Sequence, residues 1–129
     1  IGIVIVAHGA LAAEYLKAIE HVVGLQRGMC AITIEADHNR TEKKLDLRAA
    51  DAVDTGAGVV VVTDLFGGSP SNLSLLACQP ENRRILYGAN LPLLIKLAKS
   101  RQLTVADAVR DALDAGKKYI DSQNISADI

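Results

Sequence analysis

The sequence predicts an α/β fold built on a central parallel sheet, and three observations carry this prediction. Residues 59–63 and most of 1–7 are continuous β-branched runs, as in strands that are buried on both faces. Segments with apolar residues at helical spacing alternate with such runs, which is typical of parallel sheets with right-handed crossovers. Each run also stops abruptly at a polar residue, His8 or Asp64, close to glycine. In such sheets, ligands bind beyond the carboxyl ends of the strands.

Three strands and two helices are expected in the first half of the chain. The strands lie at about 1–7, 29–34 and 58–63, and helices at about 10–23 and 40–54 connect them. The first helix has apolar residues at helical spacing, which predict a buried stripe of Leu11, Tyr15, Leu16, Ile19, Val22 and Val23. The second helix has a corresponding stripe of Leu45, Ala49, Ala52 and Val53.

A third helix and a fourth strand are expected next. Ser69 is a good N-cap and Pro70 fits the first helical position, so the helix begins at Pro70 or Ser71. It runs to about Cys78. After a polar turn, residues 84–88 are expected to form the fourth strand.

Two further helices complete the pattern. Pro92 is expected to open the first of them, which runs through Lys99, and Thr104 is expected to cap the second. The inward face of this last helix comprises Val105, Ala108, Val109, Ala112 and Leu113. The segment after Asp121 has no such pattern, and we expect it to be weakly ordered or dependent on a partner.

The expected arrangement is a flavodoxin-like sheet of order 2-1-3-4, flanked by helices. This order places the first and third strands side by side, because the first crossover runs one way and the second runs the other. His8 and Asp64 would then be neighbours at the carboxyl edge of the sheet. An added antiparallel edge strand remains open. We expect residues 1–129 to form a single domain, because this length suits one hydrophobic core.

Composition argues against several classes of function. The chain has 14 basic and 15 acidic residues, no basic run and no aromatic platform, so nucleic-acid binding is not favoured. The apolar stretches are too short to span a bilayer and no signal peptide is visible, so we expect a cytoplasmic protein. Cys30, Cys78, His21 and His38 lack metal-ligand spacing, and we expect no metal and no cofactor.

His8 and Asp64 are the residues best suited to chemistry. Imidazole is nucleophilic near neutral pH because its ordinary pKa is about 6.5. One ring nitrogen can accept a phosphoryl group while the other donates a hydrogen bond. A carboxylate on that second nitrogen would fix the tautomer and support the positive charge that develops on attack. A histidine that merely ends a strand is the plainer interpretation, but the acid and the adjacent glycine favour a phosphoryl-carrying histidine.

A glycine-rich turn at the start of the third helix could bind an anion. Gly67, Gly68 and Ser69 would present backbone N–H groups and a hydroxyl, and the helix dipole would also attract phosphoryl oxygens. An ordinary tight turn explains the same residues equally well. The segment lacks the lysine of a Walker motif and the GxSxG spacing of a nucleophilic serine. Asn90, which ends the fourth strand, either closes the site or forms a turn.

Three segments together resemble the mannose-type enzyme IIA of the bacterial phosphoenolpyruvate:sugar phosphotransferase system. They are residues 3–9 (IVIVAHG), 61–72 (VVTDLFGGSPSN) and 88–92 (GANLP), and they occur in the family's order. The resemblance covers about residues 1–120. It implies a parallel sheet of order 2-1-3-4 with helices on both sides, as the residues themselves predict.

The resemblance also implies a role for each site residue. His8 would accept a phosphoryl group from the phosphocarrier HPr on Nε2 and pass it to a IIB protein or domain. Asp64 would hydrogen-bond the imidazole, and Gly67, Gly68 and Ser69 would bind the phosphoryl oxygens. The protein would thus be a transferase with a phosphohistidine intermediate that serves sugar uptake or regulation. It would meet the membrane only indirectly, through a permease complex.

Transient docking of these partners calls for a modest apolar patch beside the histidine, which we expect at Leu65, Phe66 and Leu91. The resemblance implies a homodimer, because the better-known family members pair by adding a C-terminal strand to the partner. Residues 122–129 are short and polar for that role. We therefore expect a homodimer and leave the exchange of this segment open.

Three other functions stay open. The phosphotransferase subunit that serves dihydroxyacetone kinase shares the strand-1 histidine, but residues 64–69 (DLFGGS) are closer to the mannose type. A non-transport regulatory binding module, switched by phosphorylation of His8, would use the same residues. A nucleotide-binding domain of flavodoxin-like fold would need a ribose- or base-binding feature, which the sequence does not show.

Overall fold

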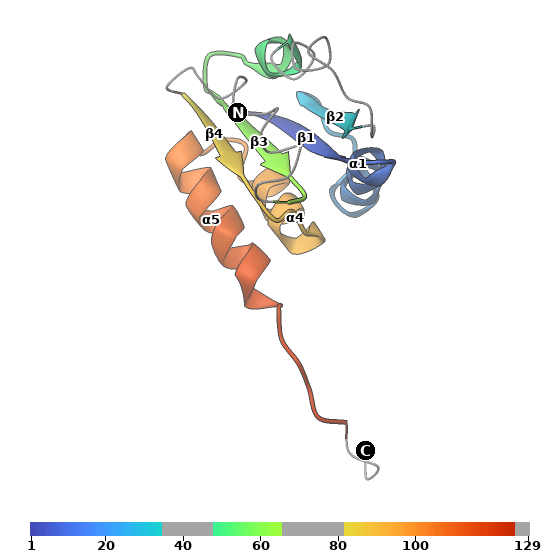
Figure 1. The fold of residues 1–129 in the computed structure, drawn as a ribbon. Helices are drawn as coiled ribbons and strands as arrows, with labels where there is room; N and C mark the ends of the chain where they lie inside the picture. Colours follow the sequence, from blue (N-terminus) through green and yellow to red (C-terminus); the bar gives the residue numbers. More distant parts are fainter. Residues whose placement is uncertain (35–47, 66–81, 126–129) are drawn as a thin grey trace.

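The computed structural model describes residues 1–34, 48–65 and 82–125 of the chain. Within these residues, four parallel strands form one sheet with helices on both of its faces (Figure 1). The strand order is β2-β1-β3-β4, which confirms the predicted α/β fold and the predicted sheet. An antiparallel edge strand is absent from this described part of the chain.

The strands follow the apolar runs of the sequence. β1 spans Gly2–His8, β2 spans Met29–Ile34, β3 spans Val59–Thr63 and β4 spans Arg83–Leu86. β1 pairs with β2 on one side and with β3 on the other. Both β1 and β3 are buried along nearly their whole length, because helices cover each face of the sheet. β4 differs from the predicted strand at 84–88, since it begins one residue earlier and ends two residues earlier.

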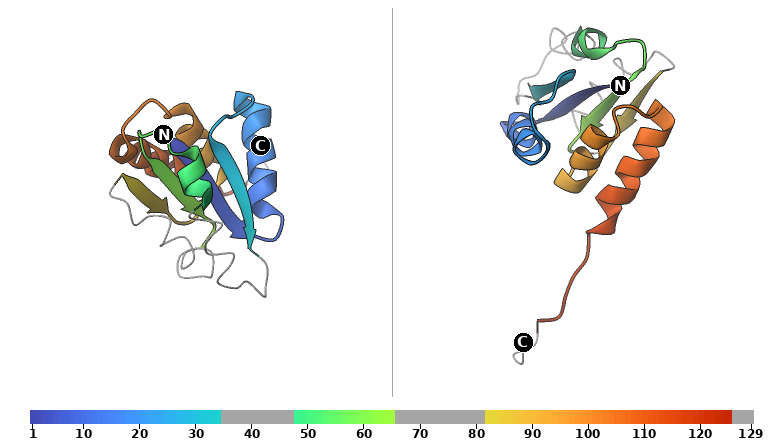
Figure 2. Two further views of the ribbon diagram at one scale, coloured as in Figure 1. Left: turned by 90° about the horizontal axis from the view of Figure 1, so that it is seen from above. Right: turned by 180° about the vertical axis from the view of Figure 1, so that it is seen from behind.

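Three helices cover one face of the sheet: α1 (Leu11–Val23), α4 (Leu91–Lys99) and α5 (Val105–Lys118) (Figure 2). They bury the larger core cluster against β1 and β3. Its fully buried members include Ile3, Ile5, Ile19, Val60, Val62 and Leu97. Burial of one such side chain contributes about 1.5–3 kcal/mol, so this cluster fixes the helices on the sheet. None of the described helices combines the length and the apolar composition that a membrane crossing requires.

The opposite face of the sheet carries a smaller core. A helix whose described part is residues 48–53 lies over this face (Figure 2). Its Ala50 is buried together with strand residues that point to this side, namely Val4, Val6, Ile34, Val59 and Val61. Cys30 of β2 packs half-buried against the same cluster. Because side chains alternate along a strand, His8 points to the same face as Val4 and Val6.

The buried stripe of α1 is narrower than the predicted one. Ala12 and Ile19 are its buried residues, whereas the predicted Leu11 and Val22 are exposed. Tyr15, Leu16 and Val23 pack partly buried against the larger cluster, as predicted. The inward-facing residues of α1 lie three, four and seven positions after Ala12. Leu11 and Val22 lie at the borders of this stripe, and the size of their side chains did not reveal that they would be exposed.

The helix at 48–53 also differs in one position. Ala50 is buried and the predicted Ala52 is exposed, because residues two apart on a helix point to nearly opposite sides. Ala49 and Val53 pack half-buried against the smaller cluster, as predicted.

Several predicted features lie outside the described residues. They are the first part of the second helix with Leu45, the turn of Gly67, Gly68 and Ser69, the docking residue Phe66, and the third helix from Pro70 to Cys78.

Helix α4 and helix α5 begin at side-chain caps. Asn90 accepts a hydrogen bond from the Leu93 N–H at 3.0 Å, and Thr104 accepts one from the Asp107 N–H at 3.2 Å. The predicted cap at Thr104 is therefore confirmed. Helix α1 ends at its C-cap Gly24, which adopts a φ of +88° that glycine reaches without strain. These caps determine where each helix meets the edge of the sheet.

An ion-pair cluster joins the amino end of β4 to the helix at 48–53. The buried Arg83 guanidinium donates hydrogen bonds to Asp51 at 2.7 Å and to Asp54 at 3.1 Å. Asp54 also accepts a hydrogen bond from the Gly56 N–H at 2.9 Å. The hydrogen bond from Gly56, and after it the contact with Arg83, hold the pKa of Asp54 below its ordinary value. A buried charge that loses such a partner destabilises a fold.

Replacement of Asp54 by Asn is expected to lower the free energy of unfolding at pH 7 by about 1–3 kcal/mol, because Arg83 loses a charged partner. A carboxyl with a lowered folded-state pKa stabilises the fold above its unfolded pKa of about 3.9, and loses this effect as the pH falls through the folded value. The difference between wild type and Asp54→Asn should therefore shrink from pH 7 to about pH 3 in urea titrations. Asp114→Asn, at an exposed aspartate of α5, is the control. An equal loss in both variants would contradict this account.

Candidate active site

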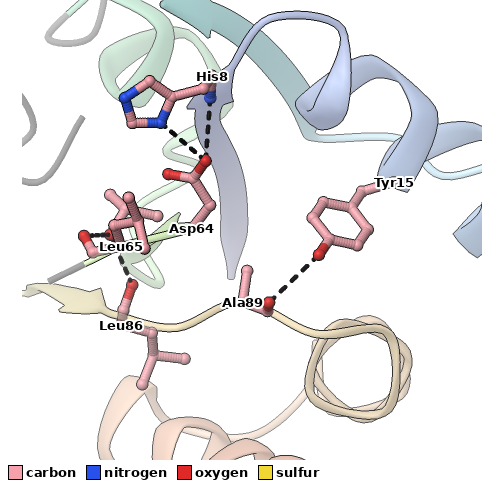
Figure 3. Close-up of polar contacts among 7 residues, drawn as sticks. His8, Tyr15, Asp64, Leu65, Leu86 and Ala89 are labelled. Atoms are coloured by element: carbon pink, nitrogen blue, oxygen red, sulfur yellow. Dashed lines mark hydrogen bonds and ion pairs between the residues drawn. The ribbon is translucent and has the colours of Figure 1, made fainter. Parts of the chain in front are cut away.

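His8 and Asp64 meet at the carboxyl edge of the sheet. His8 is the last residue of β1, and Asp64 directly follows Thr63, the last residue of β3. The two strands are parallel, and Val6 lies opposite Thr63 in their register. The ends of the strands therefore bring the imidazole and the carboxylate into contact (Figure 3). The predicted proximity of these two residues is confirmed, and it follows from the strand order.

One carboxylate oxygen of Asp64 holds His8 at two points. Oδ2 accepts a hydrogen bond from the imidazole Nδ1 at 2.9 Å and another from the backbone N–H of His8 at 3.1 Å (Figure 3). An ionised carboxylate can only accept, so Nδ1 is the protonated nitrogen of the neutral ring. Nε2 is then the nitrogen with a lone pair for chemistry. With 48% of the His8 side chain exposed, a partner can approach this ring.

The Asp64 carboxylate is nearly buried, with 10% of its side chain exposed. Its other oxygen, Oδ1, is also buried and has no hydrogen-bond partner within the described ranges. A negative charge in such surroundings is costly unless a positive charge lies close to it. Positive charge that develops on the imidazole during an attack would lie 2.9 Å from this carboxylate.

Gly9 lets the chain turn from β1 into α1. Its φ of +56° lies in the left-handed region, which disfavours side chains larger than hydrogen. Its N–H donates to the carbonyl oxygen of Ile34 in β2 at 3.3 Å, which fixes the turn to the neighbouring strand. Helix α1 begins two residues later, at Leu11. The turn thus leaves the imidazole at the edge of the sheet while the chain reverses.

The predicted docking residues lie in different surroundings. Leu65 follows Asp64 in the chain and is 55% exposed. Leu91, the first residue of α4, is half-buried and packs against the larger core cluster. The remaining predicted site residues are outside the described part of the chain, namely Phe66, Gly67, Gly68 and Ser69.

Asn90 is the N-cap of α4, a role that neither of its two expected interpretations named. Its Oδ1 caps α4, and its Nδ2 donates to the carbonyl oxygen of Gly116 in α5 at 2.9 Å. Gly116 makes this close approach possible, since a Cβ there would lie 3.0 Å from the Cβ of Leu93. The amide of Asn90 is thus used to join two helices.

Sequence reasoning missed two hydroxyl groups beneath the pair. The buried Thr63 hydroxyl lies 3.2 Å from the Leu65 carbonyl oxygen and 3.5 Å from that of Leu86, and it can donate to either (Figure 3). The Tyr15 hydroxyl donates to the Ala89 carbonyl oxygen at 3.3 Å. A tyrosine within an apolar stripe was the only signal for the second contact, and that signal does not identify the partner.

Metal-binding groups do not cluster in the part of the chain that the structure describes, where no three His, Cys, Asp or Glu side chains could hold an ion. The described site therefore offers an imidazole, a carboxylate and backbone groups.

A family model described as the PTS system fructose IIA component matches residues 2–114. The chain belongs to this family. The mannose-specific EIIAB component of the phosphotransferase system of Escherichia coli K12 is 29% identical over an alignment of 125 positions, which covers 93% of this chain. The chain spans 38% of the length of that relative. Together these similarities confirm the resemblance to the mannose-type IIA components.

Solved structures of IIA components share the fold. The EIIA component from Streptococcus agalactiae matches with a TM-score of 0.81 and 28% identity, over 94% of this chain and 95% of that one. A IIA protein associated with the fucose utilization operon of Streptococcus pneumoniae matches with a TM-score of 0.75 and 28% identity, over 88% of each chain. The IIA component described here therefore has the sheet and the flanking helices of its family.

Replacement of Asp64 by Asn is expected to leave the fold intact and to lower the fraction of His8 that carries its proton on Nδ1. The amide lacks the negative charge that makes Oδ2 a strong acceptor. Imidazole ¹⁵N chemical shifts of the neutral ring measure this fraction. Asp111→Asn, on α5, is the matched control. Unchanged shifts for His8 in Asp64→Asn would show that the carboxylate does not select the tautomer.

Proposed function

We propose that residues 1–129 form one IIA domain that carries a phosphoryl group on His8 Nε2. The group arrives from the phosphocarrier HPr and leaves to a IIB protein or domain, in service of sugar uptake or its regulation. The observation that carries this proposal is the contact of Nδ1 with Asp64, because it leaves Nε2 as the nucleophilic nitrogen on a half-exposed ring. Family membership supports the choice of reaction.

The proposed chemistry is an in-line transfer between two imidazoles. The lone pair of His8 Nε2 attacks the phosphorus of phosphohistidine on HPr. A new P–N bond forms, the old P–N bond breaks, and its electron pair returns to the HPr imidazole. The leaving group is already activated as a phosphorylated imidazole, so positioning and electrostatics supply most of the catalysis. Asp64 supports the positive charge that develops on the His8 ring.

The glycine-rich turn is the proposed cradle for the phosphoryl oxygens. Gly67, Gly68 and Ser69 follow Asp64 within five residues of sequence. Backbone N–H groups and a hydroxyl are the donors that bind phosphoryl oxygens at helix starts. The rate at which Ser69→Ala accepts a phosphoryl group from phosphorylated HPr distinguishes the contribution of the hydroxyl from that of the backbone groups.

Docking of HPr and of the IIB partner is proposed at an apolar patch of Leu65, Phe66 and Leu91. The exposure of Leu65 beside Asp64 supports this placement. A small apolar surface suits partners that must separate after each transfer. The reaction would take place in the cytoplasm, and the IIA component would meet the membrane only through its permease complex.

A homodimer is the proposed assembly. The chain leaves α5 as an extended segment that runs away from the body of the molecule (Figure 1). Tyr119, Ile120 and Ile125 are exposed on this segment, at 67%, 74% and 87%. Such side chains gain by burial against another surface. Among the described strands, β4 lies at an edge of the sheet, and we place the contact with a second copy on its outer side.

Incubation with phosphoenolpyruvate, enzyme I and HPr is expected to add one acid-labile phosphoryl group to the wild-type chain and none to His8→Gln. Intact-mass spectrometry measures the gain. His21→Gln, at an exposed histidine of α1, is the matched control and should be labelled like wild type. Labelling of His8→Gln would remove His8 as the acceptor. In the same assay, Asp64→Asn should accept the group more slowly, and an unchanged rate would remove Asp64 from the mechanism.

The downstream acceptor distinguishes the proposal from its alternatives. Transfer from the labelled chain to a mannose-type IIB domain supports it. Transfer to a dihydroxyacetone kinase instead would identify the chain as the subunit that serves this kinase. Stable labelling, with partner binding that differs between His8→Asp and His8→Ala, would identify it as the regulatory binding module.

The wild-type chain is expected to have the mass of a dimer in light scattering after size exclusion, and Ile125→Asp should shift it toward the monomer. A charge at this position opposes burial of the segment in an interface. Leu25→Asp, at a residue of similar exposure beyond α1, is the control. A monomeric wild-type chain at tens of micromolar would contradict the proposed assembly.

A further inference from the structure

Tyr15 of α1 lies beneath the candidate active site, apart from the imidazole. Its hydroxyl donates to the Ala89 carbonyl oxygen at 3.3 Å, on the segment that follows β4 (Figure 3). The ring packs half-buried against the larger core cluster, on the sheet face that the three helices cover. The His8 side chain points to the opposite face, as Val6 does. Tyr15 can therefore influence the histidine only through the groups that lie between them.

A closed circuit of covalent and hydrogen bonds provides that connection. The chain itself runs from His8 to Tyr15 through the turn and the start of α1. Ala89 accepts the hydrogen bond of the Tyr15 hydroxyl and donates its own N–H to the Thr63 carbonyl oxygen at 2.9 Å. Thr63 precedes Asp64, and Asp64 Oδ2 accepts from both N–H groups of His8. If one group in this closed series of bonds shifts, the groups bonded to it shift as well.

The surroundings keep the Tyr15 hydroxyl protonated, as a donor must be. Burial raises the pKa of Tyr15, and the negative charge of Asp64 raises it further. The Ala89 carbonyl oxygen gives the partly buried hydroxyl the hydrogen bond that it needs.

We propose that Tyr15 is a positioning residue for the His8–Asp64 pair. Its hydroxyl ties α1 to the segment after β4, and this segment holds the carboxyl end of β3. The Asp64 carboxylate is thereby kept at hydrogen-bonding distance from Nδ1, and Nε2 keeps its direction. The consequence for transfer rests on the proposed phosphoryl-carrier function. Tyr15 itself touches neither the phosphoryl group nor its donor.

Two substitutions isolate the hydroxyl. Tyr15→Phe removes it and keeps the buried ring, and Tyr119→Phe makes the same change at a tyrosine that is 67% exposed. Tyr15→Leu, which also lacks the hydroxyl, is a second variant in case the first one folds poorly. Circular dichroism and thermal unfolding establish that each variant is folded.

Two measurements are made on every folded variant. The first is the fraction of neutral His8 with its proton on Nδ1, from imidazole ¹⁵N chemical shifts of the unphosphorylated chain. The second is the single-turnover rate of transfer from phosphorylated HPr, over a range of donor concentrations.

Tyr15→Phe is expected to lower the Nδ1–H fraction and to slow saturated transfer by about two- to tenfold, the factor that corresponds to the net free energy of one neutral hydrogen bond. The donor concentration at half-maximal rate should stay unchanged, because the docking surface is intact. Tyr15→Leu should change both quantities in the same direction, and Tyr119→Phe should match wild type.

Wild-type ¹⁵N shifts for His8 in folded Tyr15→Phe would overturn the inference, whatever the transfer rate. Equal rate changes in Tyr15→Phe and Tyr119→Phe would also overturn it. The tautomer measurement needs no phosphoryl donor. It therefore decides the positioning role even if the wild-type chain fails to accept a phosphoryl group, a result that by itself would overturn only the proposed function.

Discussion

The parallel pairing of β1 with β3 is the constraint on which the candidate site depends. The two strands are separated in sequence by one strand and two helices, yet their register places Val6 opposite Thr63. The residues of the candidate site follow closely: Asp64 comes directly after Thr63, and His8 comes two residues after Val6. Had the third strand added beyond β2, the Asp64 carboxylate would lie two strand spacings, roughly 10 Å, from β1 and could not hold the imidazole. The strand order alone thus brings the two strand ends together.

The two faces of the sheet differ at this edge: one supports the strand ends, and the other carries the imidazole. The helices on one face bury the larger cluster and place Tyr15, Ala89 and Asn90 beneath the strand ends. The imidazole of His8 points to the other face, where a partner can approach it. Support on one side of this edge and a half-exposed imidazole on the other suit the phosphoryl carrier that we propose.

Much of the fold could be predicted because its signals are local. The apolar runs predicted β1, β2 and β3 to within a residue or two, and the cap at Thr104 predicted the start of α5. The burial of Leu11, Val22 and Ala52 was predicted wrongly, because the rotation of a helix on a sheet depends on what it packs against. The contact between His8 and Asp64 was predicted only by way of the assumed strand order. The contacts of Tyr15 and Thr63 were not predicted, since nothing in the sequence near a hydroxyl group indicates which group it will bind.

The sequence by itself determined which residues can do chemistry and which segments can be strands and helices. It placed a nucleophilic imidazole and a carboxylate at the ends of two buried strands, and residue types and hydrophobic periodicity were enough for this. Only the tertiary structure decided that one oxygen of Asp64 holds both the ring and the backbone of His8, and that Asn90 serves to join helices. Those choices depend on how closely segments that are far apart in the chain approach one another. Packing sets such distances, and no local pattern in the sequence encodes them.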